Sequence, residues 1–333
     1  MRTRFGTSRL PSWLYALVCA LAMTATGVRS DSLSSCHDLP STAGTPVRLT
    51  STLALLSAAA YLNCPPNIDH GEAHYEVTGV FPGTTRESSG LAYVVYRVTG
   101  TGEPVSTVIA FRGTESSWRE WVLGNVPILR LQSRRALRAM DRELEAVPVQ
   151  QPVLLTGHSL GGGIATTLWR YHPERTNMRA FAFNSSPLLG CLWFDGRRCQ
   201  QDSRQTYGRW SNSYETGDPT RRLGNLLFPH RWNWLSKLLR GVDRDCYYRK
   251  LNFSAGGALS SHSIDNLARS LATDEDGEGT PLVDALEAIN CHQRAEHGTH
   301  GQCAESVVLK DLAVHFPKTC HPPLGAQADD RHP

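Results

Sequence analysis

The chain reads VLLTGHSLGGG from Val153 to Gly163. An apolar strand pattern runs directly into Gly157, and a helix pattern of small residues follows Gly161. The five central residues fit the G-x-S-x-G pattern, in which a serine occupies a strained turn between a strand and a helix. Glycine on both sides of Ser159 avoids Cβ clashes where the helix crosses close to the strand. The stretch therefore predicts a strand–turn–helix unit that presents Ser159 as a nucleophile, with His158 packed under the turn.

Predicted strands and helices alternate on both sides of this turn. β-branched and aromatic runs predict strands at 91–98, 105–111, 153–155, 178–183, 212–214 and 247–253. Helical patterns cover 50–63, 132–147, 161–171, 262–272, 280–290 and 304–314, and the second of these is amphipathic. Such alternation is typical of an α/β protein with a parallel sheet covered by helices on both faces.

The first thirty residues differ from the rest of the chain. Arg2, Arg4 and Arg9 precede an apolar stretch from Trp13 to Ala25, and small residues follow. This layout is typical of a secretory signal peptide, and a membrane anchor is the alternative. We expect a signal peptide at 1–30, a single domain at 31–321 and a flexible polar tail at 322–333.

Charge and cysteine content agree with an exported protein. The chain has 34 basic and 31 acidic residues, and the leader holds four of the arginines, so the mature chain is nearly neutral. This balance gives no indication of nucleic-acid binding. Of nine cysteines, Cys19 lies in the leader, and the even remainder predicts disulfides in a secreted chain. Cys191/Cys199 and Cys291/Cys303 are the closest pairs; the second lies among histidines, so a zinc site is its alternative.

A serine nucleophile needs a base and an acid that orients the base, and on this architecture the chain order is Ser, Asp or Glu, then His. Asp218 follows the extended segment 212–214 and precedes Pro219, at the carboxyl end of a predicted strand. A simple turn aspartate is the alternative. His262 follows the 247–253 strand after a loop of small residues, and His230 is its rival for the role of base.

Four stretches together resemble the class 3 lipases, the fungal-type triacylglycerol lipases and their relatives. The stretches are Val108–Thr114 (VIAFRGT), Thr156–Gly163 (TGHSLGGG), Phe181–Pro187 (FAFNSSP) and Asn212–Pro219 (NSYETGDP). The resemblance covers roughly residues 50–270. It implies an α/β-hydrolase fold, with a mostly parallel central sheet flanked by helices and a lid segment.

The resemblance also implies a role for particular residues. Ser159, Asp218 and His262 would form the catalytic triad. Thr114 and Leu160 would form the oxyanion hole, Thr114 through its backbone N–H and hydroxyl and Leu160 through its backbone N–H. Relatives often carry a histidine near the position of His230 without using it in catalysis. No metal or organic cofactor is expected.

Two segments bear on the substrate. Residues 115–131, where relatives keep a lid, are apolar for a loop, and Trp118, Trp121 and Val122 are the lid candidates. A helix packed permanently on the domain is the alternative. Residues 195–250 interleave 12 basic residues with tryptophans, which favours an anionic lipid surface, although a solvated basic face would have the same composition.

The sequence thus predicts a secreted, extracellular or periplasmic, serine carboxylic-ester hydrolase. Its expected substrates are triacylglycerol or phospholipid acyl esters, bound with or without a lipid interface, and no obligate protein partner is implied. An esterase for soluble esters, such as a feruloyl-type enzyme, is the first alternative. A catalytically inactive hydrolase fold used for binding is the second.

Overall fold

The computed structural model describes residues 47–81, 91–100, 105–113, 126–172, 174–185, 210–215, 248–251, 264, 268, 281–296, 303–309 and 312–318. The predicted signal peptide and C-terminal tail lie outside the described residues. In the described part of the chain, no helix combines the length and the apolar character needed to cross a bilayer.

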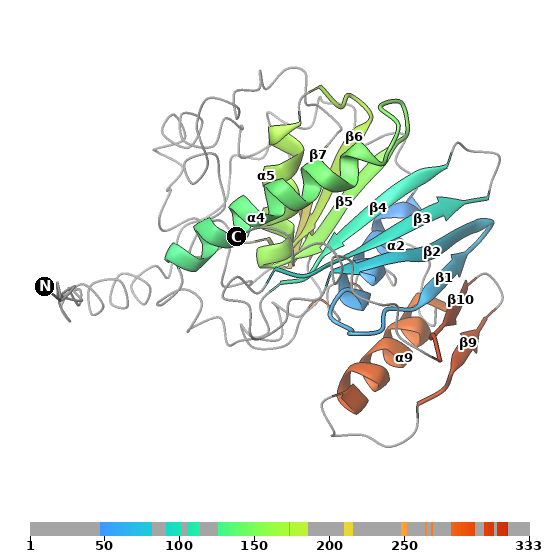
Figure 1. The fold of residues 1–333 in the computed structure, drawn as a ribbon. Coiled ribbons are helices and arrows are strands. Elements are labelled where there is room, and N and C mark those ends of the chain that lie inside the picture. The colour runs from blue at the N-terminus through green and yellow to red at the C-terminus, as the bar shows by residue number, and fades with distance from the viewer. Residues whose placement is uncertain are drawn as a thin grey trace, which may run out of the picture.

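Ten strands of the described residues form one mixed sheet, in the order β8-β7-β6-β5-β4-β3-β2-β1-β10-β9 (Figure 1). They are β1 (Asn67–His70), β2 (Ala73–Phe81), β3 (Tyr93–Thr99), β4 (Ser106–Phe111), β5 (Val153–His158), β6 (Met178–Phe183), β7 (Trp210–Glu215), β8 (Tyr248–Leu251), β9 (Ser306–Val308) and β10 (Leu312–His315). Strands β4 to β8 pair in parallel. The other pairs are antiparallel. The predicted parallel sheet is therefore confirmed around the Ser159 turn, and an antiparallel extension adjoins it.

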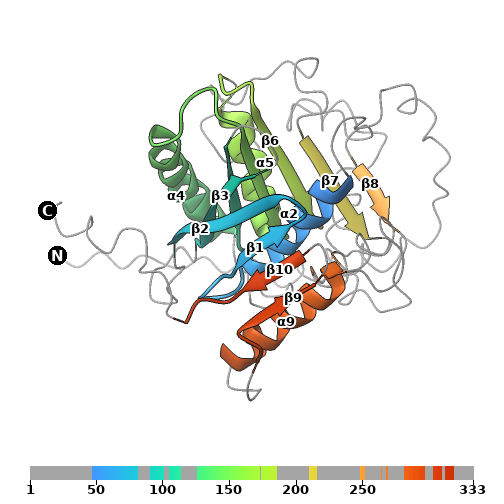
Figure 2. The ribbon, with the colours of Figure 1, turned by 90° about the vertical axis from the view of Figure 1, so that its right-hand side faces the viewer.

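Helices cover both faces of this sheet. They are α2 (Val47–Ala59), α4 (Val126–Glu145), α5 (Leu160–Tyr171) and α9 (Pro281–Glu296). One buried cluster joins α2 and α9 to alternate residues of β2, β3 and β4, including Val77, Tyr96 and Val108. A second cluster joins α4 and α5 to the opposite set, including Ile109 and Leu155. Figures 1 and 2 show α4 and α5 on one side of the parallel strands and α2 on the other.

The predicted helix at 304–314 is wrong, because this segment forms the β9–β10 hairpin. Strand β10 pairs with β1 and buries Leu312 and Val314 on one face, a period of two. The amide of Leu309 donates to the carbonyl of Leu312 at 2.8 Å and closes the turn. The apolar residues of so short a segment fit a helical period as well as a strand period. The segment becomes a strand because it pairs with the side of β1 that β2 leaves open.

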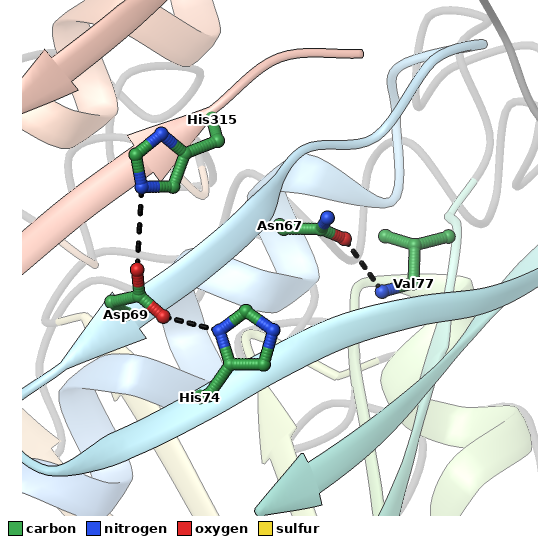
Figure 3. A network of polar contacts seen from close by, with 5 residues as sticks. All are labelled: Asn67, Asp69, His74, Val77 and His315. Atoms are coloured by element: carbon green, nitrogen blue, oxygen red, sulfur yellow. Dashed lines mark hydrogen bonds and ion pairs between the residues drawn. The ribbon is translucent and has the colours of Figure 1, made fainter.

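The β1–β2 hairpin was not predicted, because its first strand is mostly polar. Asp69 of β1 lies between His74 of β2 and His315 of β10, and contacts both imidazoles (Figure 3). The distance from Asp69 Oδ2 to His315 Nε2 is 3.2 Å. The amide of Val77 also donates to the side chain of Asn67 at 2.8 Å. The contacts of Asp69 tie β10 of the C-terminal hairpin to β1 and β2.

A disulfide joins α9 to the start of this hairpin. Cys291 and Cys303 are bonded, with their Cα atoms 5.9 Å apart. This bond confirms the prediction of a disulfide between these two cysteines. Cys64 is also disulfide-bonded. The pair Cys191/Cys199 lies outside the described residues.

Candidate active site

Ser159 occupies the turn between β5 and α5 in a strained backbone conformation. Its φ is 54° and its ψ is −120°. Among the described residues other than glycine, Asn184, at the end of β6, is the one further residue with positive φ. The amide of Ser159 donates to the carbonyl of Phe183 at 3.0 Å, and its carbonyl accepts the amide of Gly163 at 3.2 Å. Strain of this kind persists where the surroundings over-determine the backbone, which is common at catalytic sites.

The glycines around Ser159 are required by close backbone contacts. A Cβ at Gly161 would lie 2.1 Å from the carbonyl oxygen of Phe111, and a Cβ at Gly157 would lie 2.5 Å from the carbonyl carbon of Gly161. Helix α5 therefore starts directly against the carboxyl ends of β4 and β5. This geometry confirms the predicted role of both glycines.

Buried hydroxyl groups hold β5 on α2 beneath this turn. The hydroxyls of Ser57 and Thr156 form a 2.8 Å hydrogen bond with each other, and they lie 2.8 and 3.3 Å from the carbonyl oxygen of Leu53. Both side chains are fully buried. The last turns of α2 thus fix the strand that leads into Ser159.

His158 packs under the turn, as predicted. It is 5% exposed, and its Nδ1 forms a 3.0 Å hydrogen bond with the hydroxyl of Tyr61, which follows α2. A Cβ added to Gly113 would lie 2.3 Å from this hydroxyl and 3.3 Å from Cβ of Ser159. The end of β4 therefore reaches the candidate nucleophile.

Leu160 begins α5, directly after Ser159, and its side chain is buried. The amides in the first turn of a helix have no intrahelical acceptor and carry the positive end of the helix dipole. They are suited to stabilise an oxyanion that forms on an ester attacked by Ser159. The described residues thus place a serine and an anion-stabilising helix end at one edge of the parallel sheet.

The other predicted site residues lie outside the described residues. They are Asp218, His262, its rival His230, the oxyanion residue Thr114, and the lid candidates Trp118, Trp121 and Val122. The structure does describe the neighbours of three of them. Gly113 immediately precedes Thr114, β7 ends at Glu215 shortly before Asp218, and Ile264, close to His262, is helical and buried in the cluster around α2.

Tyr61 and Gly113 were not predicted to lie at the site. Tyr61 contacts His158 across 97 positions of the chain, and no local pattern indicates such a contact. In the part of the chain that the structure describes, no group of three or more His, Cys, Asp or Glu residues is arranged to hold a metal ion.

A strand–serine–helix turn on the parallel part of a mixed sheet defines an α/β-hydrolase type of fold. Residues 52–205, which span α2 to β6 and include Ser159, match the phospholipase-like family described as the Tle-like phospholipase domain. The chain therefore has a lipase-like fold, as the resemblance implied. No curated protein matches the sequence.

Several solved lipase structures are similar to the chain. M37 lipase is 10% identical, with 76% of this chain and 99% of that one covered and a TM-score of 0.44. The Rhizomucor miehei lipase propeptide complex is 15% identical, with 55% of this chain and 64% of that one covered and a TM-score of 0.36. Lip2 lipase from Yarrowia lipolytica is 13% identical, with 53% of this chain and 74% of that one covered and a TM-score of 0.35. The chain spans less than two thirds of the Rhizomucor miehei lipase.

Proposed function

We propose that the protein is a serine ester hydrolase that cleaves lipid acyl esters through an acyl-Ser159 intermediate. The observation that carries this proposal is the strained backbone of Ser159, with φ of 54°, between β5 and the first turn of α5. The match of residues 52–205 to a phospholipase domain supports a lipid substrate.

In the proposed mechanism, His262 takes the proton of the Ser159 hydroxyl as that oxygen attacks the ester carbonyl. Asp218 orients the imidazole and stabilises its cation. The backbone N–H groups of Thr114 and Leu160 bind the oxyanion, where one such donor is worth roughly 3–4 kcal/mol. The imidazolium then protonates the leaving alcohol, and water hydrolyses the acyl-enzyme by the same groups.

Phospholipid is the substrate that we place first. The matching family is one of phospholipases, and the tryptophans and basic residues of 195–250 suit an anionic lipid surface. Trp118, Trp121 and Val122 would belong to a lid that opens at this surface.

We further propose that the protein is secreted as a single domain, residues 31–321, after removal of residues 1–30. The N-terminal sequence supports export, and so does the Cys291–Cys303 disulfide, because such bonds form and persist in oxidising compartments.

Hydrolysis by the mature, oxidised chain tests this proposal. Short- and long-acyl p-nitrophenyl esters, triacylglycerol and phosphatidylglycerol vesicles are compared for the wild type, Ser159→Ala and the control Ser106→Ala at the far end of β4. We expect turnover by the wild type and the control only, with long-chain lipid preferred above its aggregation threshold. Preference for short soluble esters would favour the esterase alternative. Equal inertness of all three proteins would favour the binding-protein alternative.

A further inference from the structure

Tyr61 lies between the end of α2 and the turn that carries Ser159. Its amide donates to the carbonyl of Ala58 at 3.1 Å, so its backbone is tied to the last turn of the helix. Its half-buried ring packs against the core cluster on the α2 face of the sheet. From this anchored position its hydroxyl forms the 3.0 Å hydrogen bond with Nδ1 of His158. The ring of Tyr61 thus packs on the core, and its hydroxyl binds His158, the residue before the nucleophile.

The same hydroxyl contacts the end of β4. A methyl group on Gly113 would lie 2.3 Å from the Tyr61 hydroxyl, 2.8 Å from the carbonyl oxygen of His158 and 3.3 Å from Cβ of Ser159. Tyr61, the serine turn and the end of β4 therefore meet at the Cα of Gly113. No side chain fits there, so the contact between the two loops is direct.

This meeting point adjoins, along the chain, the two residues proposed as oxyanion donors. Leu160 belongs to the serine turn, and Thr114 follows Gly113 directly, so the two N–H groups come from different loops. The stabilisation of an oxyanion depends on donors held at a fixed separation before the reaction. The packing at Gly113 sets how closely the two loops approach.

We infer that Tyr61 is a positioning residue for the ester-hydrolase site: its hydroxyl holds the end of β4 and His158 in register with Ser159. This inference rests on the proposed function. Removing the hydroxyl takes one hydrogen-bond partner from His158, a residue that is 5% exposed, and opens space beside Gly113. Both changes let Gly113 move away from the serine turn while the nucleophile itself stays in place.

The test is Tyr61→Phe beside Tyr93→Phe. Both substitutions remove a phenol hydroxyl, and in Tyr93→Phe the lost contact is a 2.8 Å hydrogen bond to Glu143 on α4, away from Ser159. We expect Tyr61→Phe to lower kcat by about 10-fold, with KM within about 2-fold of the wild type, since displaced catalytic groups reduce turnover rather than binding. Labelling of Ser159 by a fluorophosphonate should slow by a similar factor. Tyr93→Phe should leave both rates unchanged.

Thermal unfolding separates positioning from a general loss of stability. We expect the Tm of Tyr61→Phe to fall no further than that of Tyr93→Phe, and the kcat deficit to persist well below both Tm values. A kcat equal to that of Tyr93→Phe would overturn the inference. A deficit that disappears on cooling would also overturn it.

A double-mutant cycle with Gly113→Ala tests the contact itself. The added methyl would clash with the Tyr61 hydroxyl, so this substitution should reduce kcat strongly in the wild type. In the Tyr61→Phe background the nearer clashing atom is gone and only the 2.8 Å contact with the carbonyl oxygen of His158 remains. The reduction should then be at least about 3-fold smaller, as expected for residues in contact. Equal reductions in the two backgrounds would show that the hydroxyl does not meet Gly113, which contradicts the inference.

The failures of this inference and of the proposed function are distinguishable. If the wild type hydrolyses its ester in a Ser159-dependent way and Tyr61→Phe turns over equally fast, the inference alone fails. If the wild type hydrolyses no ester and Ser159 is not labelled, the proposed function fails and the inference with it.

Discussion

The two halves of the sheet are held together by different means. In the parallel half, β4 and β5 meet α5 through backbone contacts that only glycine permits, at Gly157 and Gly161. In the antiparallel half, β1, β2 and β3 are held by buried tyrosines and by polar contacts at the edge, such as those of Asp69. Such glycine contacts gather around Ser159, whereas in the antiparallel half one of them, between Gly100 and Glu72, lies away from the serine turn.

This difference predicts that damage to the two halves has separable effects. A change at the glycine contacts beside Ser159 should reduce activity beyond any loss of stability. A change in the antiparallel half should reduce stability and leave the turnover of the folded protein intact.

Alanine substitution of one glycine in each half gives the sharpest contrast. Gly161→Ala places a methyl 2.1 Å from Phe111 O beside Ser159, and Gly100→Ala places one 2.0 Å from Glu72 O in the antiparallel half. Gly100 also has φ of 103°, so alanine is strained there. We expect kcat/KM on a long-acyl ester to fall at least about 100-fold for Gly161→Ala. Gly100→Ala should lower Tm but keep wild-type kcat below that Tm. Loss of kcat in both variants would contradict the prediction that the two halves of the sheet affect activity and stability separately.

Removal of the Cys291–Cys303 disulfide should destabilise the antiparallel half alone. The bond closes a loop with a sequence separation of 12. The loop-entropy relation gives about 2–3 kcal/mol for a loop of this length. We expect the double substitution to serine to lower the free energy of unfolding in urea by that amount, with hydrogen exchange increasing first in α9 and β10. A matching fall in kcat would show that the two halves are coupled.

The buried tyrosines of β2 and β3 predict a loss of stability in alkali. Burial raises the pKa of Tyr75 to about 12, and burial also raises the pKa of Tyr93 and Tyr96 above its usual value of 10. The folded state therefore holds these protons more tightly than the unfolded chain. This contribution is complete below pH 10 and decreases as the pH rises from 10 to about 12 for Tyr75.

Tyr75→Phe and Tyr96→Phe test this dependence. We expect the free energy of unfolding of either variant to fall less steeply between pH 9 and pH 11 than that of the wild type. In the described structure, the Tyr96 hydroxyl is buried with no hydrogen-bond partner. Its removal should therefore stabilise the protein at pH 7, by roughly 1 kcal/mol. If the free energy of unfolding of both variants falls with pH as steeply as that of the wild type, the raised pKa of these buried tyrosines is not the cause of the alkaline loss.

The edge contacts of Asp69 should have the smallest effect. Asp69, His74 and His315 are each about 40–45% exposed, so solvent screens their interactions. We expect Asp69→Asn to lower the free energy of unfolding by less than about 1 kcal/mol at pH 6, and to leave ester hydrolysis unchanged. A larger loss, or a loss of activity, would show that this edge supports the site.

The local patterns were sufficient to predict the parallel half. The strands and helices around Ser159 have clear periods, and their alternation predicted the α/β class. The glycines in residues 153–163 marked the turn between β5 and α5 and so predicted Ser159. The disulfide followed from cysteine spacing in an exported chain.

The parts of the structure that were not predicted depend on contacts between residues that are far apart in the chain. The segment around Leu312 becomes a strand because β1 offers a free edge, which its own residues do not indicate. Tyr61 reaches His158 and Gly113 only after α2 packs on the sheet. The predicted roles of Asp218, His262 and Thr114 concern residues outside the described part of the chain, and they stay predictions.

Covalent labelling of Ser159 tests the central claim most directly. The mature, oxidised wild type and Ser159→Ala are incubated with a long-alkyl fluorophosphonate, and intact mass and peptide mapping locate the adduct. We predict one phosphonyl group per wild-type chain, on Ser159, with parallel loss of ester hydrolysis and no adduct on Ser159→Ala. A wild type that stays unlabelled, or equal labelling of both proteins at another residue, would contradict the claim that this strained serine is a nucleophile.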